Sequence, residues 1–120
     1  MKSYHETDPE FAERFDHFAF DEVVNEPGQQ LEPVTRHMAI LATLLGCQGK
    51  EEFAEELPRA LDAGLTPVMV KEVVYQAVDY LGIGRVRPFL DLTNGELERR
   101  GVALPLAGQA TTTMDDRLEK

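Results

Sequence analysis

Two ionisable residues, His37 and Glu56, lie beside the apolar helix faces predicted for the run from Thr35 to Arg85. A carboxylate next to an imidazole stabilises the protonated ring, which then acts as a proton donor or an anion anchor near neutral pH. Arg36 precedes His37, and a guanidinium can hold a carboxylate through two parallel hydrogen bonds. These residue types indicate acid–base chemistry on a small, anionic molecule.

Each of these residues also has a structural interpretation. His37 lies near a predicted helix start, where a histidine is often partly exposed and has no function. Glu56 belongs to a strongly acidic helix, in which a solvated surface position is the usual one. Arg36 can equally pair with a neighbouring carboxylate or with a partner subunit. The sequence leaves both interpretations open for all three residues.

Cys47 is the single cysteine of the chain, so the chain cannot form an internal disulfide. A lone cysteine is most often a small buried or turn residue, and a reactive thiol with a redox role is the alternative. The chain has no cysteine pair at metal-binding spacing, no phosphate-binding glycine loop and no nucleophile elbow. We therefore expect neither a metal nor an organic cofactor.

The elements that carry these residues are all predicted to be helices. Asp8-Pro9 and Thr66-Pro67 each combine an N-cap residue with a proline at the first helical position. The uncharged stretch from Met38 to Leu45 predicts a central helix surrounded by protein. Pro58 predicts a kink or a later helix start, and Gly64 predicts a helix end. Helical spacing and these signals predict helices over about 9–24, 33–46, 51–63, 66–81 and 85–100.

The predicted architecture is an all-α, single-domain bundle of about five to six helices. Residues 1–102 form this domain, and residues 103–120 form a C-terminal tail that is disordered or packed on a partner subunit. Four phenylalanines between Phe11 and Phe20 are expected in the core or at a subunit interface. Helices this apolar in a short chain expose more apolar surface than a monomer tolerates, which predicts a homo-oligomer.

The charge balance restricts the possible partners. Twelve Lys and Arg against 22 Asp and Glu give a net charge of −10. This charge repels phosphate backbones and anionic lipid, so we expect neither a nucleic-acid partner nor a membrane partner. The sequence shows neither a signal-peptide core nor an apolar run long enough to span a bilayer. A cytoplasmic location is the resulting prediction.

Several segments together resemble the carboxymuconolactone decarboxylase family over about residues 8–101. They are Pro9-Glu10-Phe11, Pro27-Gly28, Thr35-Arg36, Ala60-Leu61, Gly64-Leu65-Thr66, Lys71-Glu72-Val73, and Tyr80 with Gly82. The resemblance implies helical subunits assembled into rings, as trimers or hexamers. It also implies decarboxylation of 4-carboxymuconolactone to an enol-lactone in aromatic-acid catabolism. Relatives of the alkylhydroperoxidase-D type reduce peroxides with a cysteine pair, a glutamate and a histidine.

The chain departs from the pattern of those peroxidase relatives at the site itself. No cysteine pair precedes the family histidine position, which is held here by Glu56. The family glutamate position, nineteen residues upstream, holds His37, so the two residue types are exchanged. If the helices pack as the resemblance implies, a histidine–carboxylate contact survives with its ends reversed. Tyr80 then offers a hydroxyl to the substrate, and Arg85 adds positive potential.

Three functions follow as alternatives. The first is a cofactor-free decarboxylase that acts on a small carboxylated lactone. The second is an alkylhydroperoxidase-like antioxidant protein, in which Cys47 reacts with peroxide and pairs between subunits. The third is a non-catalytic oligomeric binding module whose family site has decayed, which is favoured if His37 and Glu56 both point into solvent and no enclosed pocket is present.

Overall fold

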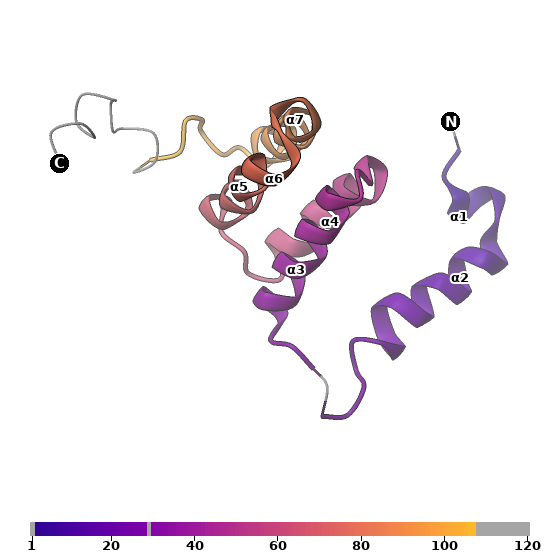
Figure 1. Cartoon of the computed structure of the whole chain (residues 1–120). Coiled ribbons are helices and arrows are strands. Elements are labelled where there is room, and N and C mark those ends of the chain that lie inside the picture. The colour runs from indigo at the N-terminus through magenta and orange to yellow at the C-terminus, as the bar shows by residue number, and fades with distance from the viewer. Residues whose placement is uncertain (1, 29, 108–120) are drawn as a thin grey trace, which may run out of the picture. The chain divides into compact units, whose positions relative to one another are not determined.

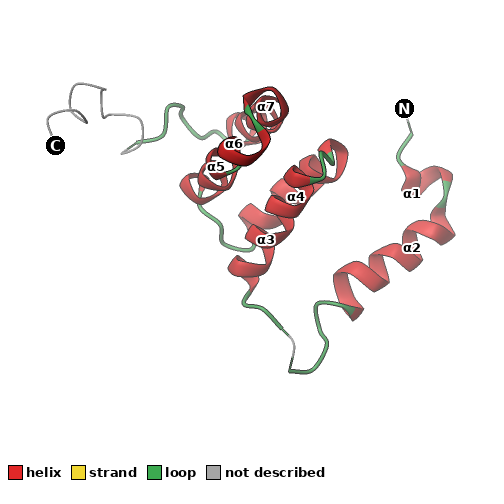
Figure 2. Cartoon of the chain, in the orientation of Figure 1, coloured by secondary structure: helices red, strands yellow, loops and turns green. Residues whose placement is uncertain are grey.

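The computed structural model describes residues 2–28 and 30–107, and in this part of the chain every regular element is helical (Figure 2). The all-α prediction is confirmed. The chain divides into two compact units, residues 1–32 and 33–120. The predicted domain 1–102 therefore covers the first unit and most of the second, and residues 108–120 of the predicted tail lie outside the described residues. No helix among the described residues is long and apolar enough to cross a membrane.

The first unit contains α1 (Tyr4–Thr7), α2 (Pro9–His17) and a π-helical turn, η1 (Phe18–Glu22). The first of these helices was not predicted, and the predicted helix over 9–24 changes to π-helical geometry at Phe18. Pro9 begins α2 as expected, but Asp8 makes no side-chain capping bond, because it instead accepts a hydrogen bond from the Thr7 hydroxyl at 2.6 Å.

The phenylalanines of the first unit form an exposed aromatic row. The rings of Phe11 and Phe15 stack at 6.5 Å, and Phe15 meets Phe20 edge-on at 5.9 Å. Phe11 and Phe18 are nevertheless 62% and 57% exposed. Of the two predicted places, the core is therefore not where these side chains lie, because the four-residue helix α1 is too short to cover the row. The subunit-interface interpretation stays a prediction.

The second unit contains α3 (Pro33–Gly46), α4 (Lys50–Asp62), α5 (Pro67–Gln76), α6 (Val78–Leu81) and α7 (Ile83–Arg99). Helices α3 and α4 pack side by side as a hairpin, while α7 packs against α4, α5 and α6 (Figure 1). A three-residue turn joins α3 to α4, so the two helices run in opposite directions. This hairpin carries both candidate acid–base residues.

One apolar core holds these five helices together. The rings of Phe53 and Phe89 meet edge-on at 5.0 Å, and both are fully buried. The other members of the core are aliphatic or small: Leu41, Leu45, Leu57, Ala60, Leu65, Val70, Val74 and Val86. On α3, Ala39 and Ala42 are exposed, so the expectation that this helix is covered on all sides is not met within the chain.

Local signals place most of the helix ends. Thr66 caps α5 by accepting a hydrogen bond from the Met69 N–H at 3.1 Å. Gly64 follows α4 with a φ of +118°, a conformation that favours glycine. Helix α4 begins at Lys50 and continues through Pro58, so of the two outcomes predicted for this proline the later start is wrong, and the kink stays a prediction. The predicted helix over 66–81 divides at Ala77 into α5 and α6.

A buried lysine ties α5 to α7. Lys71 is 8% exposed, and its Nζ donates to Asn94 Oδ1 at 2.6 Å. The same nitrogen lies 5.8 Å from the centre of the Tyr75 ring, within the range of a cation–π contact. The amide and the ring partly replace the water that the ammonium loses on burial. Lys71 therefore has a structural role between these two helices.

The end of α7 is fixed by a cluster of arginines around Glu96. This carboxylate accepts hydrogen bonds from Arg99 Nε at 3.0 Å and from Arg100 Nε at 2.7 Å. The bonds from Arg99, and then those from Arg100, outweigh partial burial and lower the pKa of Glu96 to about 2. Arg100 also donates to Asp62 Oδ1 at 3.0 Å and to the Pro58 carbonyl at 3.3 Å, which joins α7 to α4.

The low pKa of Glu96 predicts a loss of stability in acid. The folded-state pKa lies below the unfolded value, so the stabilisation is complete above about pH 5 and is lost as the pH falls toward 2. Glu96→Gln should lower the free energy of unfolding at pH 7 by about 1 kcal/mol, after allowance for solvent screening. This difference should shrink as the pH falls toward 2 and vanish only below the folded-state pKa of about 2. Denaturation by urea at several pH values measures it, with the exposed Glu98→Gln as control. An equal loss at pH 7 and pH 2 contradicts the prediction.

Candidate functional site

His37 and Glu56 meet across the α3–α4 hairpin. His37 lies in the second turn of α3, Glu56 lies in the middle of α4, and His37 Nδ1 is hydrogen-bonded to Glu56 Oε1. The side chains are 14% and 3% exposed. The interpretation of Glu56 as a solvated surface residue is therefore wrong. The hairpin brings together two residues that are nineteen positions apart, and it places Glu56 in the row of α4 that faces α3.

This contact fixes the orientation of the imidazole ring. An ionised carboxylate only accepts hydrogen bonds, so Nδ1 of His37 is the donor to Glu56. The other ring nitrogen, Nε2, takes no part in this contact. The pairing also compensates the burial of Glu56, because a buried carboxylate without a hydrogen-bonding partner is strongly unfavourable. The contact therefore holds the imidazole ring against α4.

Arg59 is a third member of the candidate site, and it is not among the residues predicted from the sequence. Its Nη1 donates to Glu56 Oε2 at 3.5 Å, and its Nη2 lies 3.9 Å from Glu55 Oε2. Each oxygen of the Glu56 carboxylate thus has its own partner. The spacing of Arg59 and Glu56 could have indicated this contact, because residues three apart on a helix are neighbours on its surface.

The other predicted site residues are not in contact with this pair. Arg36 is half-buried and makes no hydrogen bond or ion pair with any other described residue. Successive residues of a helix point about 100° apart, so Arg36 leaves α3 in a different direction from His37. Tyr80 is 90% exposed on α6, and Arg85 is exposed in the first turn of α7.

Cys47 lies at the opposite end of α3 from His37. It follows the last residue of the helix, is exposed, and its Sγ donates to the Leu44 carbonyl at 3.5 Å. Ten residues of helix separate it from His37, which corresponds to about 15 Å along the axis. The thiol therefore does not belong to the group formed by His37, Glu56 and Arg59.

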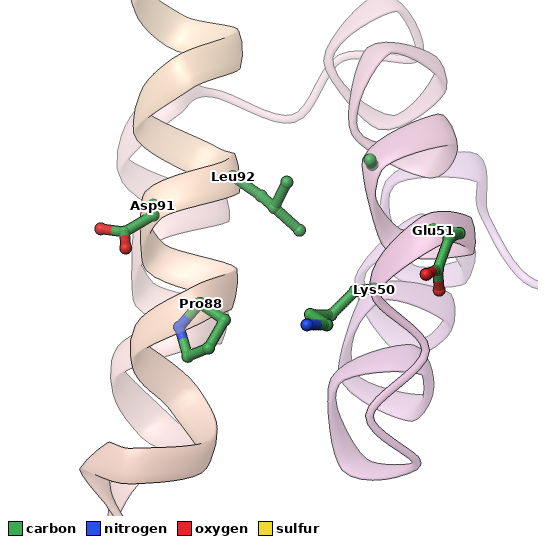
Figure 3. A pocket seen from close by; sticks show the side chains of 6 residues that line it. Lys50, Glu51, Pro88, Asp91 and Leu92 are labelled. Carbon is green, nitrogen blue, oxygen red and sulfur yellow. The ribbon is translucent and has the colours of Figure 1, made fainter. Parts of the chain in front are cut away.

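A groove of about 490 Å³ lies between α4 and α7 (Figure 3). The side chains of Lys50 and Leu92 point toward the facing helix, whereas the carboxylate of Asp91 points away from the groove. Glu51, Ala54 and Pro88 complete its lining. The groove is on a different part of α4 from Glu56, and its charged residues have mixed signs. Among the described residues, no three His, Cys, Asp or Glu side chains cluster as a metal site.

The comparison with protein families gives one finding. The model of the family described as "Carboxymuconolactone decarboxylase family" matches residues 9–94, well over half of the chain. Neither a search of curated proteins nor a search of solved structures gave a significant match. The matched range contains both residues of the buried histidine–carboxylate pair. This protein belongs to the carboxymuconolactone decarboxylase family.

Proposed function

We propose that this protein is a cofactor-free decarboxylase that acts on a small carboxylated lactone in aromatic-acid catabolism. The observation that carries the proposal is the contact of His37 with the buried Glu56 in a member of this family. A buried pair of this kind costs stability unless it is well compensated, so its presence on the α3–α4 hairpin supports a role other than stability. A decayed site would leave both side chains free to point into solvent.

The proposed reaction replaces carbon dioxide with a proton. The bond between the substrate carboxylate and its ring carbon breaks, and its electron pair moves toward the lactone carbonyl. Carbon dioxide leaves, and an enolate-like state forms. His37, protonated on Nε2 and held by Glu56, stabilises the negative charge and returns a proton to carbon, then recovers a proton from solvent. The products are the enol-lactone and carbon dioxide.

Substrate binding is assigned to arginine and tyrosine side chains. We propose that Arg36 attracts the substrate carboxylate, since it is half-buried on the same helix as His37 and has no partner among the described residues. Tyr80 and Arg85 are exposed, so they contact the substrate only if a second subunit or a conformational change brings them to it. We therefore assign them only a secondary role in substrate binding.

The test is turnover by the purified full-length chain. Incubation with 4-carboxymuconolactone should release carbon dioxide and form the enol-lactone, with an active decarboxylase in the same assay as positive control. A parallel assay with organic peroxide and a dithiol reductant tests the antioxidant alternative, and Cys47→Ser should leave that signal unchanged. The absence of turnover of every carboxylated lactone tried, while the control is active, contradicts the proposal.

We also propose that the protein works as a homo-oligomer, a trimer or a hexamer. The support is apolar surface in the second unit, where Tyr80 is 90% and Ile83 is 59% exposed. Exposed apolar side chains that lie close together are typical of interfaces. Light scattering should give a mass of about three or six times the 13.5 kDa of one chain. A monomer mass across a broad range of concentrations contradicts this prediction.

A further inference from the structure

Both oxygens of the Glu56 carboxylate have a side-chain partner. One oxygen, Oε1, is bound to His37, and the other, Oε2, lies 3.5 Å from Arg59 Nη1. The four side chains are linked in a row in which Glu56 is the most buried, with exposed fractions of 45% for Glu55, 39% for Arg59 and 3% for Glu56. His37, at 14%, completes it.

A carboxylate with only one partner is free to change its orientation. The terminal torsion of a glutamate is broad, so rotation exchanges the two oxygens or tilts the carboxylate plane at little cost. A guanidinium on the second oxygen restricts this rotation, because its N–H groups have a fixed geometry. A restricted carboxylate in turn restricts the ring that donates to it, as in other histidines that are oriented by an acidic partner.

We propose that Arg59 is a positioning residue for the His37–Glu56 pair. It holds Oε2 of Glu56, so that Oε1 stays on Nδ1 of His37 and Nε2 stays directed to the substrate. The inference rests on the proposed function only for the identity of that substrate, since the orientation of His37 is a property of the protein alone. Arg59 acts through Glu56 and does not touch the reacting atoms.

The alternative role for Arg59 is that of an ordinary surface ion pair. Its guanidinium also lies 3.9 Å from Glu55, four residues earlier on α4, and an exposed pair of this spacing adds little stability. Such a pair would leave the His37 ring unaffected when it is removed. The two roles therefore differ in what they predict for His37, and a measurement on this ring separates them.

The test is the proton on His37 Nδ1, observed by NMR of the full-length protein. A proton held in a strong hydrogen bond to a carboxylate gives a resonance far downfield that exchanges slowly with water. Arg59→Gln and Arg59→Met should weaken or remove this resonance, whereas Arg59→Lys keeps a cation and should retain part of it. Arg99→Gln is the matched control, because Arg99 also follows its glutamate by three residues but lies far from any histidine in sequence.

The outcomes separate this inference from the proposed function. Loss of the resonance in Arg59→Gln or Arg59→Met, with an unchanged signal in Arg99→Gln, supports it whether or not the protein turns over a lactone. In an active protein, kcat should fall about tenfold in Arg59→Gln, with KM within about twofold of its original value. An unchanged His37 resonance in folded Arg59→Gln and Arg59→Met, or its absence from the unsubstituted protein, overturns the inference.

Discussion

His37→Ala is expected to lower kcat for a carboxylated lactone by about 10²- to 10⁴-fold, the usual contribution of a positioned general acid or base. The substitution removes the ring that Glu56 orients and leaves a buried carboxylate with Arg59 as its partner. Glu56→Gln keeps the shape of the side chain but removes its charge, so its effect on kcat should be smaller. Both variants should still fold, because neither residue belongs to the apolar core, but His37→Ala should be less stable since the buried Glu56 loses one of its two partners.

The measurement is the initial rate of enol-lactone formation, together with circular dichroism of each variant. His17→Ala is a suitable control, since His17 is another histidine beside carboxylates but is 65% exposed in the first unit. It should retain full activity. A value of kcat in folded His37→Ala that equals that of the unsubstituted enzyme would show that the ring takes no part in the chemistry.

Phe53→Ala is expected to lower the free energy of unfolding by about 3–5 kcal/mol. Phe53 is fully buried, and its ring meets Phe89 edge-on at a centroid distance of 5.0 Å. Truncation removes the apolar contacts of the ring and leaves a cavity between α4 and α7. A loss of this size is a large part of the total stability of a domain of about 90 residues.

Urea denaturation followed by circular dichroism measures this loss, because the chain has no tryptophan to report by fluorescence. The matched control is Phe11→Ala, which truncates the same side chain where it is 62% exposed. The control should change the unfolding free energy by less than about 0.5 kcal/mol. If the two variants lose equal stability, the Phe53–Phe89 contact is not the centre of the core.

The sequence predicted those parts of the fold that depend on local physical rules. Thr66-Pro67 and Gly64 specify helix ends through one hydrogen bond and one backbone conformation, and both were identified correctly. The change to π-helical geometry at Phe18 has no local signal, because a stretch of this kind differs from an α-helix by one residue per turn. The exposure of Ala39 and Ala42 depends on which elements face α3, which periodicity does not show.

The candidate site was only partly predictable. No spacing rule pairs residues nineteen positions apart, so the contact of His37 with Glu56 was expected from family resemblance and not from the residues alone. The burial of Glu56 was not predicted, because the acidic composition of its helix favours exposure and does not show which face of α4 points inward. Arg59 was predictable from its position one turn after Glu56, but only once Glu56 is known to be buried.

The contacts that Arg100 makes with Asp62 and the Pro58 carbonyl also affect the proposed active site. They fasten the last turn of α4 to the end of α7, while the short turn at Gly49 fastens its beginning to α3. A helix held at both ends opens only together with its neighbours. The backbone amides around Glu56 should therefore exchange with heavy water only when the second unit unfolds as a whole. The contact of Glu56 with His37 is thus protected by the cooperative unfolding of the second unit.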